Sequence, residues 1–370
     1  MFYYGCMTQF GDEMGTVPRG VRARARGALS NDSGRFEAAA RVAVEDGWDI
    51  EEEARLLQAE VRVERARSAI SYNASPDLPF DRSINPYRGC EHGCAYCYAR
   101  PSHAYLNLSP GLDFETKLIA RPGIGAVLAR ELRARAYRPA VIAIGTNTDP
   151  YQPVEAEYRV MREVLEVLCA FQHPVAITTK GALVERDLDI LGPMGQAGLA
   201  RVGVSITTLD ARLSRALEPR APSPQRRLAM IERLAKAGCP VRVMVAPVIP
   251  GLTDAEMETI LASARDAGAV AASWIMLRLP GEVEGLFRDW LAAHAPGRAQ
   301  KVLARLAELH GGAVYNPAFG TRMRGKGVWA ELMAKRFALA LGRLGLALHQ
   351  PALRCDLFAS PAQVGDQLSL

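Results

Sequence analysis

The sequence of 370 residues has no long run of uncharged apolar residues, so we expect no segment that crosses a membrane. Residues 1–13 lack a basic start followed by a long apolar stretch, and we therefore expect no secretory signal there. Cysteine is scarce and odd in number, with seven in the chain, which argues against a disulfide framework and predicts a reducing, cytoplasmic setting. The net charge of +5 is too modest to identify an anionic partner by itself.

Three of the seven cysteines nevertheless lie close together, in the run Cys90-Glu-His-Gly-Cys94-Ala-Tyr96-Cys97. Thiolates at this spacing can bind three corners of a cubic iron–sulfur cluster and leave the fourth iron open to a substrate or cofactor. Clusters used only for electron transfer normally have four protein ligands, so the missing fourth cysteine indicates chemistry at the metal. A zinc site is the weaker alternative, because zinc takes four ligands, usually from two Cys-x-x-Cys pairs, and only Cys94 and Cys97 form such a pair.

From residue 83 onward, short apolar runs alternate with segments of helical periodicity. The runs are rich in valine and isoleucine, as in strands buried on both faces, and their alternation with helices implies a parallel sheet with right-handed crossovers. After a first strand near residues 83–88, we expect strands at 140–144, 175–177, 202–206, 241–246 and 273–277. Helices are expected at 124–135, 155–171, 184–191, 224–237 and 254–267, which gives six strand–helix units.

We expect five regions along the chain. Residues 1–35 hold glycine, proline and a basic run, and predict a poorly ordered tail. Residues 36–82 predict an N-terminal extension that packs on the barrel, with a helical stretch at 50–57 and an edge strand at 61–65. The strand–helix units occupy residues 83–285, a mostly helical C-terminal region follows at 286–350, and residues 351–370 form a tail without a clear signal.

The spacing of the three cysteines, with an aromatic residue directly before the last, resembles the signature of the radical S-adenosylmethionine (SAM) superfamily. The resemblance implies an α/β fold of partial (β/α)6 TIM type, a 4Fe-4S cluster on Cys90, Cys94 and Cys97, and SAM on the open iron. It also implies that an electron from the cluster splits SAM into a deoxyadenosyl radical, which abstracts hydrogen from a substrate. Because active sites of parallel barrels lie at the carboxyl ends of the strands, the residues that follow each strand are the candidate SAM ligands.

Polar residues follow the second and third predicted strands. The resemblance implies that Thr148 or Asp149 binds the amino group of SAM, although the Gly-Gly-Glu pattern common in the superfamily is absent here. An Asx turn that leads into the next helix is the alternative for this loop. After the third strand, Lys180 is the candidate for the SAM carboxylate, and a surface lysine is the alternative.

The fourth and fifth strands are followed by further candidates. Ser205 is placed to bond the ribose hydroxyls or the carboxylate of SAM, and Glu218 is a candidate for the ribose. Nearby Thr208 or Asp210 can instead cap a helix. Val248 lies between two prolines and suits packing against adenine.

One aromatic residue and two basic features need a separate interpretation. Tyr96 can stack on adenine or pack the cluster loop, and Arg278, after the sixth strand, can meet an anionic substrate or a core carboxylate. The basic, glycine-rich stretch 316–327 can bind phosphate through backbone amides and guanidinium groups, or simply lead into the next helix.

A wider set of motifs resembles the radical SAM proteins grouped with spore photoproduct lyase, a DNA repair enzyme. The likeness covers roughly residues 20–345, and its motifs are 85–90, 98–103, 146–153, 218–221 and 322–325. That enzyme returns a hydrogen atom to its product from a cysteine in the loop after the second strand, whereas this chain has no thiol there. We therefore do not expect the same thymine-dimer reaction, and Tyr98, next to Cys97, is the candidate hydrogen donor.

The sequence therefore predicts a radical SAM enzyme of lyase or oxidoreductase type. The expected partners are a one-electron donor such as flavodoxin or ferredoxin and an unknown substrate, for which the family likeness and the basic stretch favour nucleic acid. The alternative is a non-catalytic Fe–S electron carrier or redox sensor, which needs neither SAM nor polar residues at the strand ends. A zinc-stabilised nucleic-acid-binding module is a third hypothesis.

Overall fold

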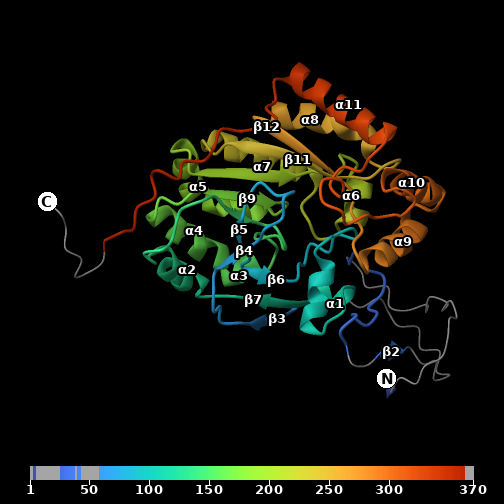
Figure 1. Cartoon of the computed structure of the whole chain (residues 1–370), viewed down its shortest axis with the longest axis horizontal. Coiled ribbons are helices and arrows are strands. Elements are labelled where there is room, and N and C mark those ends of the chain that lie inside the picture. Colours follow the sequence, from blue (N-terminus) through green and yellow to red (C-terminus); the bar gives the residue numbers. More distant parts are fainter. Residues whose placement is uncertain (1–2, 6–25, 38–39, 43–57, 363–370) are drawn as a thin grey trace.

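The computed structural model describes residues 3–5, 26–37, 40–42 and 58–362, and a seven-stranded sheet forms its centre (Figure 1). Six strands run parallel, and β4 pairs antiparallel with β5 at one edge. In spatial order the strands are β12 (Ala271–Met276), β11 (Val241–Val248), β10 (Ala200–Ser205), β9 (Val175–Thr179), β8 (Ile142–Ile144), β5 (Arg82–Ile84) and β4 (Ile70–Tyr72). The outermost strands β12 and β4 do not pair with each other, so the sheet is an open, partial barrel.

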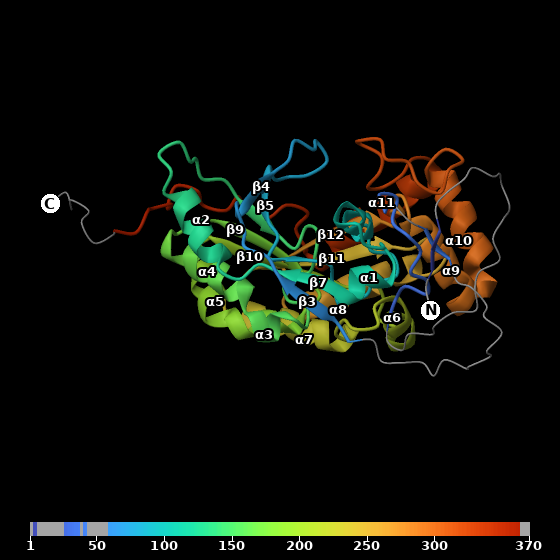
Figure 2. The same ribbon diagram turned by 90° about the horizontal axis from the view of Figure 1, so that it is seen from below.

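Helices between the parallel strands cover one face of this sheet. Figure 2 shows α4, α5 and α7 along that face, while the β4–β5 hairpin projects from the other. The covering helices are α2 (Ile124–Leu132), α4 (Val160–Ala170), α5 (Leu188–Gln196), α7 (Pro224–Lys236) and α8 (Met257–Asp266). The predicted α/β fold, a partial (β/α)6 barrel with an N-terminal extension and a C-terminal helical segment, is confirmed.

One predicted helix is divided in two. In place of a continuous helix at 155–171, α3 (Glu155–Tyr158) ends at Arg159, whose φ is +51°, and α4 follows. The carboxylate of Glu155 accepts a hydrogen bond of 3.0 Å from the backbone N–H of Met161 in the first turn of α4. The break therefore lets a buried side chain satisfy one of the free N–H groups at the start of a helix. A second prediction, the helix at 184–191, is met by the short helix η2 (Ala182–Asp187) and α5.

A small second sheet has the order β3 (Glu60–Val63), β7 (Lys117–Ala120) and β6 (Tyr87–Arg88). Strand β3 lies at its edge, as predicted for residues 61–65. Strands β1 (Tyr3–Gly5) and β2 (Ala40–Val42) pair antiparallel. The helical stretch predicted at 50–57 lies outside the described residues.

Residues 26–35 differ from the poorly ordered tail predicted for them. The N–H groups of Gly27 and Ala28 donate to the carboxylate of Glu115 at 3.0 and 2.8 Å, and the Asn31 side chain donates to Asp113 at 3.1 Å. Glu115 belongs to α1 (Leu112–Thr116) and is fully buried. The segment is fixed by partners more than eighty residues away, which its own composition does not reveal.

The C-terminal region is mostly helical, as predicted, with α9 (Val283–His294), α10 (Pro296–Leu309) and α11 (Val328–Leu344). Residues 347–359 then run across the N-terminal ends of the parallel strands. Ala347 pairs with the backbone of β12, and the N–H groups of Arg354 and Ala359 donate to Gly198 and Phe171, which precede β10 and β9. The predicted C-terminal tail is thus a packed strap at 351–362, and residues 363–370 lie outside the described part.

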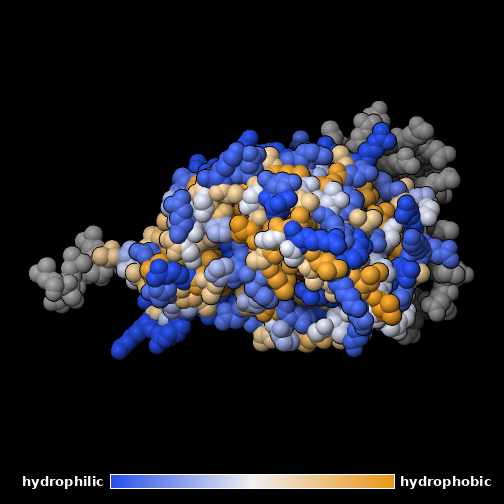
Figure 3. Space-filling view, turned by 90° about the horizontal axis from the view of Figure 1, so that it is seen from above, coloured by the Kyte–Doolittle hydropathy of each residue, from blue (hydrophilic) through white to orange (hydrophobic). Residues whose placement is uncertain are grey.

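Buried apolar side chains of the sheet and its covering helices form the main core, and a second cluster links the cysteine-rich loop to α9 and α10. The face that carries α8 and α11 mixes apolar and charged side chains (Figure 3), and Val328, Leu332 and Leu339 are exposed on α11. No helix among the described residues combines the length and apolar character that a membrane span requires.

Candidate active site

The cysteine-rich loop, residues 89–99, follows β5 and β6 at the carboxyl end of the parallel strands. Cys90 and Cys94 are buried, and Cys97 is partly exposed. The N–H of Cys90 donates to the carbonyl of Phe114 at 2.9 Å, and the N–H of Cys97 donates to that of Cys94 at 3.2 Å. The three predicted metal ligands therefore share one short loop with a fixed backbone.

Two glycines allow the N-terminal segment to lie directly on this loop. Gly93 has a φ of +65°, and a Cβ atom there would come within 2.6 Å of the Glu115 carboxylate. A Cβ atom on Gly27 would approach the carbonyl oxygen of Gly93 to 1.7 Å. Any larger residue at position 27 would thus push the segment away from the loop.

A buried ion pair supports the loop from below. The guanidinium of Arg100 lies 2.5 Å from the carboxylate of Glu115, and both side chains are fully buried. Arg100 also donates to the carbonyl oxygen of Cys94 at 3.0 Å and to those of Pro110 and Gly111. Since a buried charge needs a partner and further hydrogen bonds, these contacts hold the cysteine loop in one geometry.

The loop after β8 holds the cysteine loop from the side. The amide of Gln152 donates to the carbonyl of Gly89 at 3.0 Å and accepts from the N–H of Glu91 at 2.8 Å, so it spans Cys90. Asp149 accepts from the N–H of Tyr151 at 2.9 Å, which is the predicted Asx turn.

Asp149 also joins the second and third strand ends to the cysteine loop. Its carboxylate accepts from the hydroxyl of Thr179 at 2.6 Å and from the N–H of Lys180 at 2.7 Å, and it lies 3.3 Å from Nδ1 of His92. Burial alone would raise the pKa of Asp149, but His92 and these hydrogen bonds hold it well below the ordinary value. Both oxygens are engaged, so a role for Asp149 toward the SAM amino group stays a prediction.

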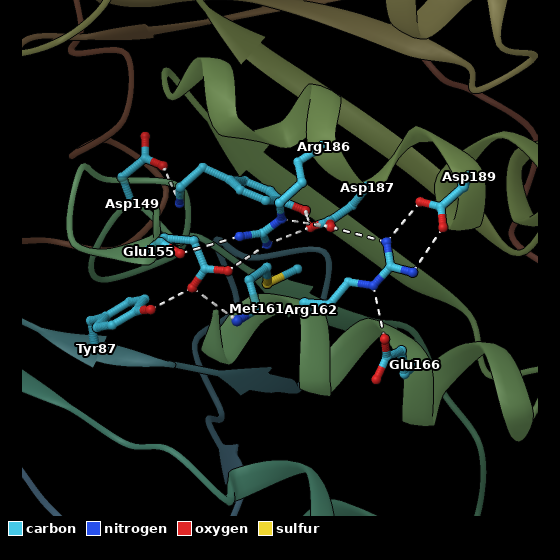
Figure 4. A network of polar contacts seen from close by, with 10 residues as sticks. Tyr87, Asp149, Glu155, Met161, Arg162, Glu166, Arg186, Asp187 and Asp189 are labelled. Atoms are coloured by element: carbon cyan, nitrogen blue, oxygen red, sulfur yellow. Dashed lines mark hydrogen bonds and ion pairs between the residues drawn. The ribbon is translucent and has the colours of Figure 1, made fainter. Parts of the chain in front are cut away.

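A network of buried charges lies behind this loop (Figure 4). The hydroxyl of Tyr87 donates to Glu155, and Arg186 lies 2.6 Å from the same carboxylate. Tyr151, inside the loop, donates to Asp187 at 3.1 Å. Glu155 and Asp187 are fully buried, so the loop after β8 is anchored to α3 and η2.

Lys180 follows β9 and faces the cysteine loop. Its Nζ lies 5.8 Å from the centre of the Tyr96 ring and makes no hydrogen bond or ion pair with any described residue. Burial would lower the pKa of Lys180, but the neighbouring Cys94 thiol and Glu218 outweigh it and raise that pKa. A charged, uncommitted ammonium group at this position fits the predicted role toward a carboxylate.

Tyr96 and Glu218 belong to one buried cluster. The hydroxyl of Tyr96 donates to Glu218 and lies 3.0 Å from that of Thr207, and Arg227 forms an ion pair with Glu218. Burial would raise the pKa of Glu218, but Arg227 and Lys180 lower it to about 2. This carboxylate is already paired with Arg227, so its predicted contact with a ribose stays untested, and its visible role is to fix Tyr96.

The other predicted strand-end residues are buried where they were expected. The hydroxyl of Thr148 donates to the carbonyl of Tyr87 at 3.1 Å, and that of Ser205 donates to Ala246 at 2.8 Å. Val248 is buried at the end of β11. The hydroxyls of Thr148 and Ser205 thus donate to backbone carbonyls, and toward a ligand they can only accept hydrogen bonds.

Tyr98 and Arg278 form a pair at the mouth of the sheet. The guanidinium of Arg278 lies 4.4 Å from the centre of the Tyr98 ring, and the Tyr98 hydroxyl donates to the carbonyl of Thr146. Arg278 also lies 3.1 Å from the sulfur of Met323 and has no carboxylate partner among the described residues. Two partners were predicted for Arg278, an anionic substrate and a core carboxylate. The described residues offer it no core carboxylate, so the anionic substrate stays a prediction.

The basic stretch 316–327 reaches the mouth from the other side. The N–H of Met276 donates to the carbonyl of Met323 at 2.9 Å, which places the stretch along β12. Its Arg322 is paired with Asp77 of the β4–β5 hairpin at 2.8 Å and is therefore not free to bind phosphate alone.

The cysteine thiols influence one another electrostatically. Burial raises the pKa of Cys90 well above its ordinary value, and Asp149, Cys94 and Cys97 raise it further. Burial raises the pKa of Cys94 to about 12, although Lys180 opposes the shift. Thiolates at these positions need a bound cation to become stable, as metal ligands do. No three or more His, Cys, Asp or Glu side chains within the described ranges are grouped so as to hold one metal ion.

The sequence profile of the radical SAM superfamily matches residues 84–264. Uncharacterized proteins of Mycobacterium tuberculosis and Mycobacterium bovis are 38% identical over 278 residues, which cover 74% of this chain and 78% of each relative. The chain belongs to the radical SAM superfamily. An uncharacterized protein of Methanocaldococcus jannaschii is 26% identical to this radical SAM protein over 174 residues, 47% of this chain and 62% of that one.

Solved structures of spore photoproduct lyase are similar in fold. Two of its variants match with TM-scores of 0.56 and 0.57 at 16% and 17% sequence identity, and cover 77% of this chain and 80% of theirs. At this identity the likeness establishes the partial-barrel fold. The recognition made from the cysteine spacing and the wider motifs is confirmed.

Membership of the radical SAM superfamily implies an iron–sulfur cluster and SAM, and the residues at the site fit both. A cube-shaped cluster presents a separate iron to each thiolate, and Cys90, Cys94 and Cys97 offer three sulfurs on one loop. The other described cysteines are Cys169, exposed on α4, Cys239, buried after α7, and Cys355, partly exposed in the strap at 351–362. None of these three lies at the carboxyl ends of the strands, and the loop after β8 holds no thiol, as expected.

Three positioning residues escaped the sequence analysis, namely Arg100, Gln152 and Arg227. The first two lie inside motifs that carry the family resemblance, at 98–103 and 146–153. Their place in these motifs is the signal that could have identified them. Arg227 lies within α7 and resembles any surface arginine of an amphipathic helix. Only the fold brings it against Glu218, so no sequence signal identified it.

Proposed function

We propose that this radical SAM enzyme binds a 4Fe-4S cluster through Cys90, Cys94 and Cys97 and cleaves SAM reductively to abstract hydrogen from its substrate. The observation that carries the proposal is the place of these thiols: one rigid loop at the carboxyl ends of six parallel strands, without a fourth cysteine nearby among the described residues. When bound, the cluster supplies one electron, and SAM supplies the deoxyadenosyl radical.

The residues around the loop divide into ligands and supports. Lys180 is proposed to bind the SAM carboxylate, because its ammonium group is charged and uncommitted. Val248 and the ring of Tyr96 are proposed to border the adenine, and Thr148 and Ser205 to accept hydrogen bonds from SAM. A variant of spore photoproduct lyase was solved with AdoMet bound, which supports a SAM site in this fold.

Asp149 and Glu218 are proposed to act as positioning residues. Asp149 ties Lys180 and His92 to the loop after β8, and Glu218 holds Tyr96 against Thr207. Both oxygens of Asp149 already have partners in His92, Thr179 and Lys180, and the charge of Glu218 is balanced by Arg227. This division revises the sequence-based assignment, in which both carboxylates were SAM ligands.

Tyr98 is the proposed hydrogen-atom donor. Its O–H hydrogen atom passes to a carbon radical of the substrate, and a phenoxyl radical stays on Tyr98. Arg278, stacked on this ring without a carboxylate partner in the described residues, is proposed to bind an anionic group of the substrate. The electron that starts each turnover is proposed to come from a carrier such as flavodoxin or ferredoxin.

Anaerobic product analysis tests the proposal. Protein with a reconstituted cluster is mixed with SAM and dithionite, and 5′-deoxyadenosine is quantified. Lys180→Met is expected to raise the SAM concentration for half-maximal rate by about tenfold or more, since a hydrogen bond between charged groups contributes about 1.5–3 kcal/mol.

The matched control is Lys236→Met, which removes an exposed lysine of α7 and is expected to change the rate less than twofold. Fully reconstituted protein that forms no deoxyadenosine would support the electron-carrier alternative instead. Equal effects of the two lysine variants would remove Lys180 from the SAM site.

A further inference from the structure

Every exposed phenylalanine or tyrosine ring in the described residues has an arginine side chain over it. The five rings belong to Phe36, Tyr72, Tyr98, Tyr105 and Phe319, with exposed fractions between 45% and 71%. In each case a guanidinium carbon lies between 4.4 and 5.6 Å from the ring centre. A single exposed ring is ordinary on a protein surface, but several rings that lie together mark a contact site for another molecule.

Four of these rings lie on neighbouring elements around the mouth. Tyr98 is in the cysteine loop, and η1 (Arg100–Leu106), which carries Tyr105, begins two residues later. The seven residues of η1 span about 14 Å at the rise of a 3₁₀-helix. Tyr105 contacts Phe36 at 5.1 Å between ring centres, and Arg35 lies over both.

Side-chain contacts connect this group to the remaining ring. Arg35 lies 3.7 Å from Glu282, four residues after Arg278, whose guanidinium covers Tyr98. Arg278 in turn contacts Met323, next to Arg322, which lies 4.7 Å from the ring of Phe319. The aromatic–arginine pairs thus form one arc, from Phe36 and Tyr105 through Tyr98 to Phe319.

We propose that this arc binds single-stranded nucleic acid, with unpaired bases stacked on the rings and phosphates bound by Arg35 and Arg278. Aromatic faces accept any base, and guanidinium groups add cation–π and phosphate contacts. A duplex hides the faces of its bases, so it fits this surface less well. The inference rests on the proposed function, because it names the substrate class that reaches Tyr98.

The charges near the arc restrict the path of the strand. Asp32, Glu282 and Asp289 border a cavity of about 250 Å³ beside Arg35, and carboxylates there repel phosphate. Asp77 balances Arg322 in part. The sugar–phosphate backbone therefore passes on the side of the guanidinium groups, with the bases toward the rings.

Fluorescence anisotropy with a labelled dodecamer of mixed sequence tests the surface. Wild-type protein is expected to bind the single strand at least tenfold more tightly than the duplex of the same sequence. Tyr105→Ala and Phe319→Ala are each expected to weaken single-strand binding at least fivefold, because one base–aromatic stack contributes about 1–3 kcal/mol.

Tyr72→Ala is the matched control. Tyr72 is exposed and covered by Arg82, as the other rings are by their arginines, but it lies on β4 opposite Arg82, at the amino end of β5. Its removal is expected to change affinity less than twofold. Three outcomes would each contradict the proposed binding surface. They are a duplex that binds as tightly as the single strand, no binding of either, and equal losses of affinity in Tyr72→Ala and Tyr105→Ala.

Deoxyadenosine formation without oligonucleotide, measured with dithionite on the same wild-type preparation, separates this proposal from the proposed function. Single-strand binding without any deoxyadenosine would leave the surface standing and overturn the enzyme. Deoxyadenosine formation without single-strand binding would overturn the surface alone.

Discussion

The two ends of the parallel sheet are held by different kinds of contact. At the carboxyl end, two buried ion pairs, Arg100–Glu115 and Arg227–Glu218, and the contact between His92 and Asp149 surround the cysteine loop. At the amino end, the strap at 351–362 packs through Phe358 on the rings of Tyr137, His173 and Phe171.

This difference shows that contacts which orient a site and contacts which stabilise the fold are of different kinds. Buried ion pairs add little net stability because desolvation offsets their attraction, but each strongly disfavours any geometry that separates the partners. Aromatic packing stabilises through buried area and tolerates small shifts. The end proposed to hold the cofactors therefore relies on buried charges, whereas the opposite end combines aromatic packing with hydrogen bonds.

The largest expected effect concerns the ligands themselves. Cys94→Ala is expected to abolish the brown cluster absorption almost completely, because the site has no spare protein ligand, whereas Cys169→Ala on α4 leaves it unchanged. Absorption of anaerobically reconstituted protein measures both. Similar losses in the two variants would mean that the cluster is bound elsewhere.

The ion pair under the loop gives the next largest effect. Glu115→Gln leaves the buried Arg100 without a counter-charge and is expected to lower the free energy of unfolding by about 3–5 kcal/mol. Urea denaturation of cluster-free protein measures it. Glu232→Gln, which breaks an exposed pair with Lys236, is expected to leave the free energy of unfolding unchanged within the error of the measurement. A small loss in Glu115→Gln would show that the cysteine end is not held by this charge.

At the opposite end, His173 predicts a pH dependence. Its imidazole is fully buried between the Tyr137 hydroxyl and the Pro174 carbonyl, and burial, with some help from Arg82, lowers its pKa from 6.5 to about 4. Between these values the unfolded chain binds a proton that the folded chain does not. Stability contributed here is therefore present above about pH 6.5 and is lost as the pH falls toward 4, by up to about 3 kcal/mol.

His173→Phe removes this titration, so its unfolding free energy is expected to fall less than that of the wild type between pH 7 and pH 4. Urea denaturation at several pH values compares the two slopes. Parallel curves would contradict the assignment of the shift to His173.

The smallest effect on stability is expected where the β4–β5 hairpin contacts the stretch 316–327. Asp77→Asn weakens the pair with Arg322 and is expected to cost about 1 kcal/mol in unfolding free energy, because both side chains are largely but not fully buried. Thermal unfolding measures it, and the cluster absorption is expected to stay unchanged. A loss of cluster absorption in this variant would mean that the Asp77–Arg322 pair also helps to hold the cysteine loop.

The comparison also marks what the sequence can predict. The strands rich in valine and isoleucine, the helices between them and the cysteine spacing are local patterns, and the sequence predicts all three. It does not predict contacts between distant segments. The sequence predicts that Asp149 and Glu218 face a ligand, because no local pattern identifies His92 and Arg227 as their partners. It predicts tails at 26–35 and 351–362 for the same reason.

The contact between Asp77 and Arg322 has a consequence for access. It joins the hairpin at one edge of the open sheet to the loop beside the other edge, and hydrogen bonds from Gly320 to Asp77 and from Arg322 to Ser75 reinforce this bridge. If the proposed single strand is the substrate, we expect a long polymer to enter either end-first past this contact or while the contact is open. Turnover on a circular strand and on a linear one of equal length would tell these two modes of entry apart.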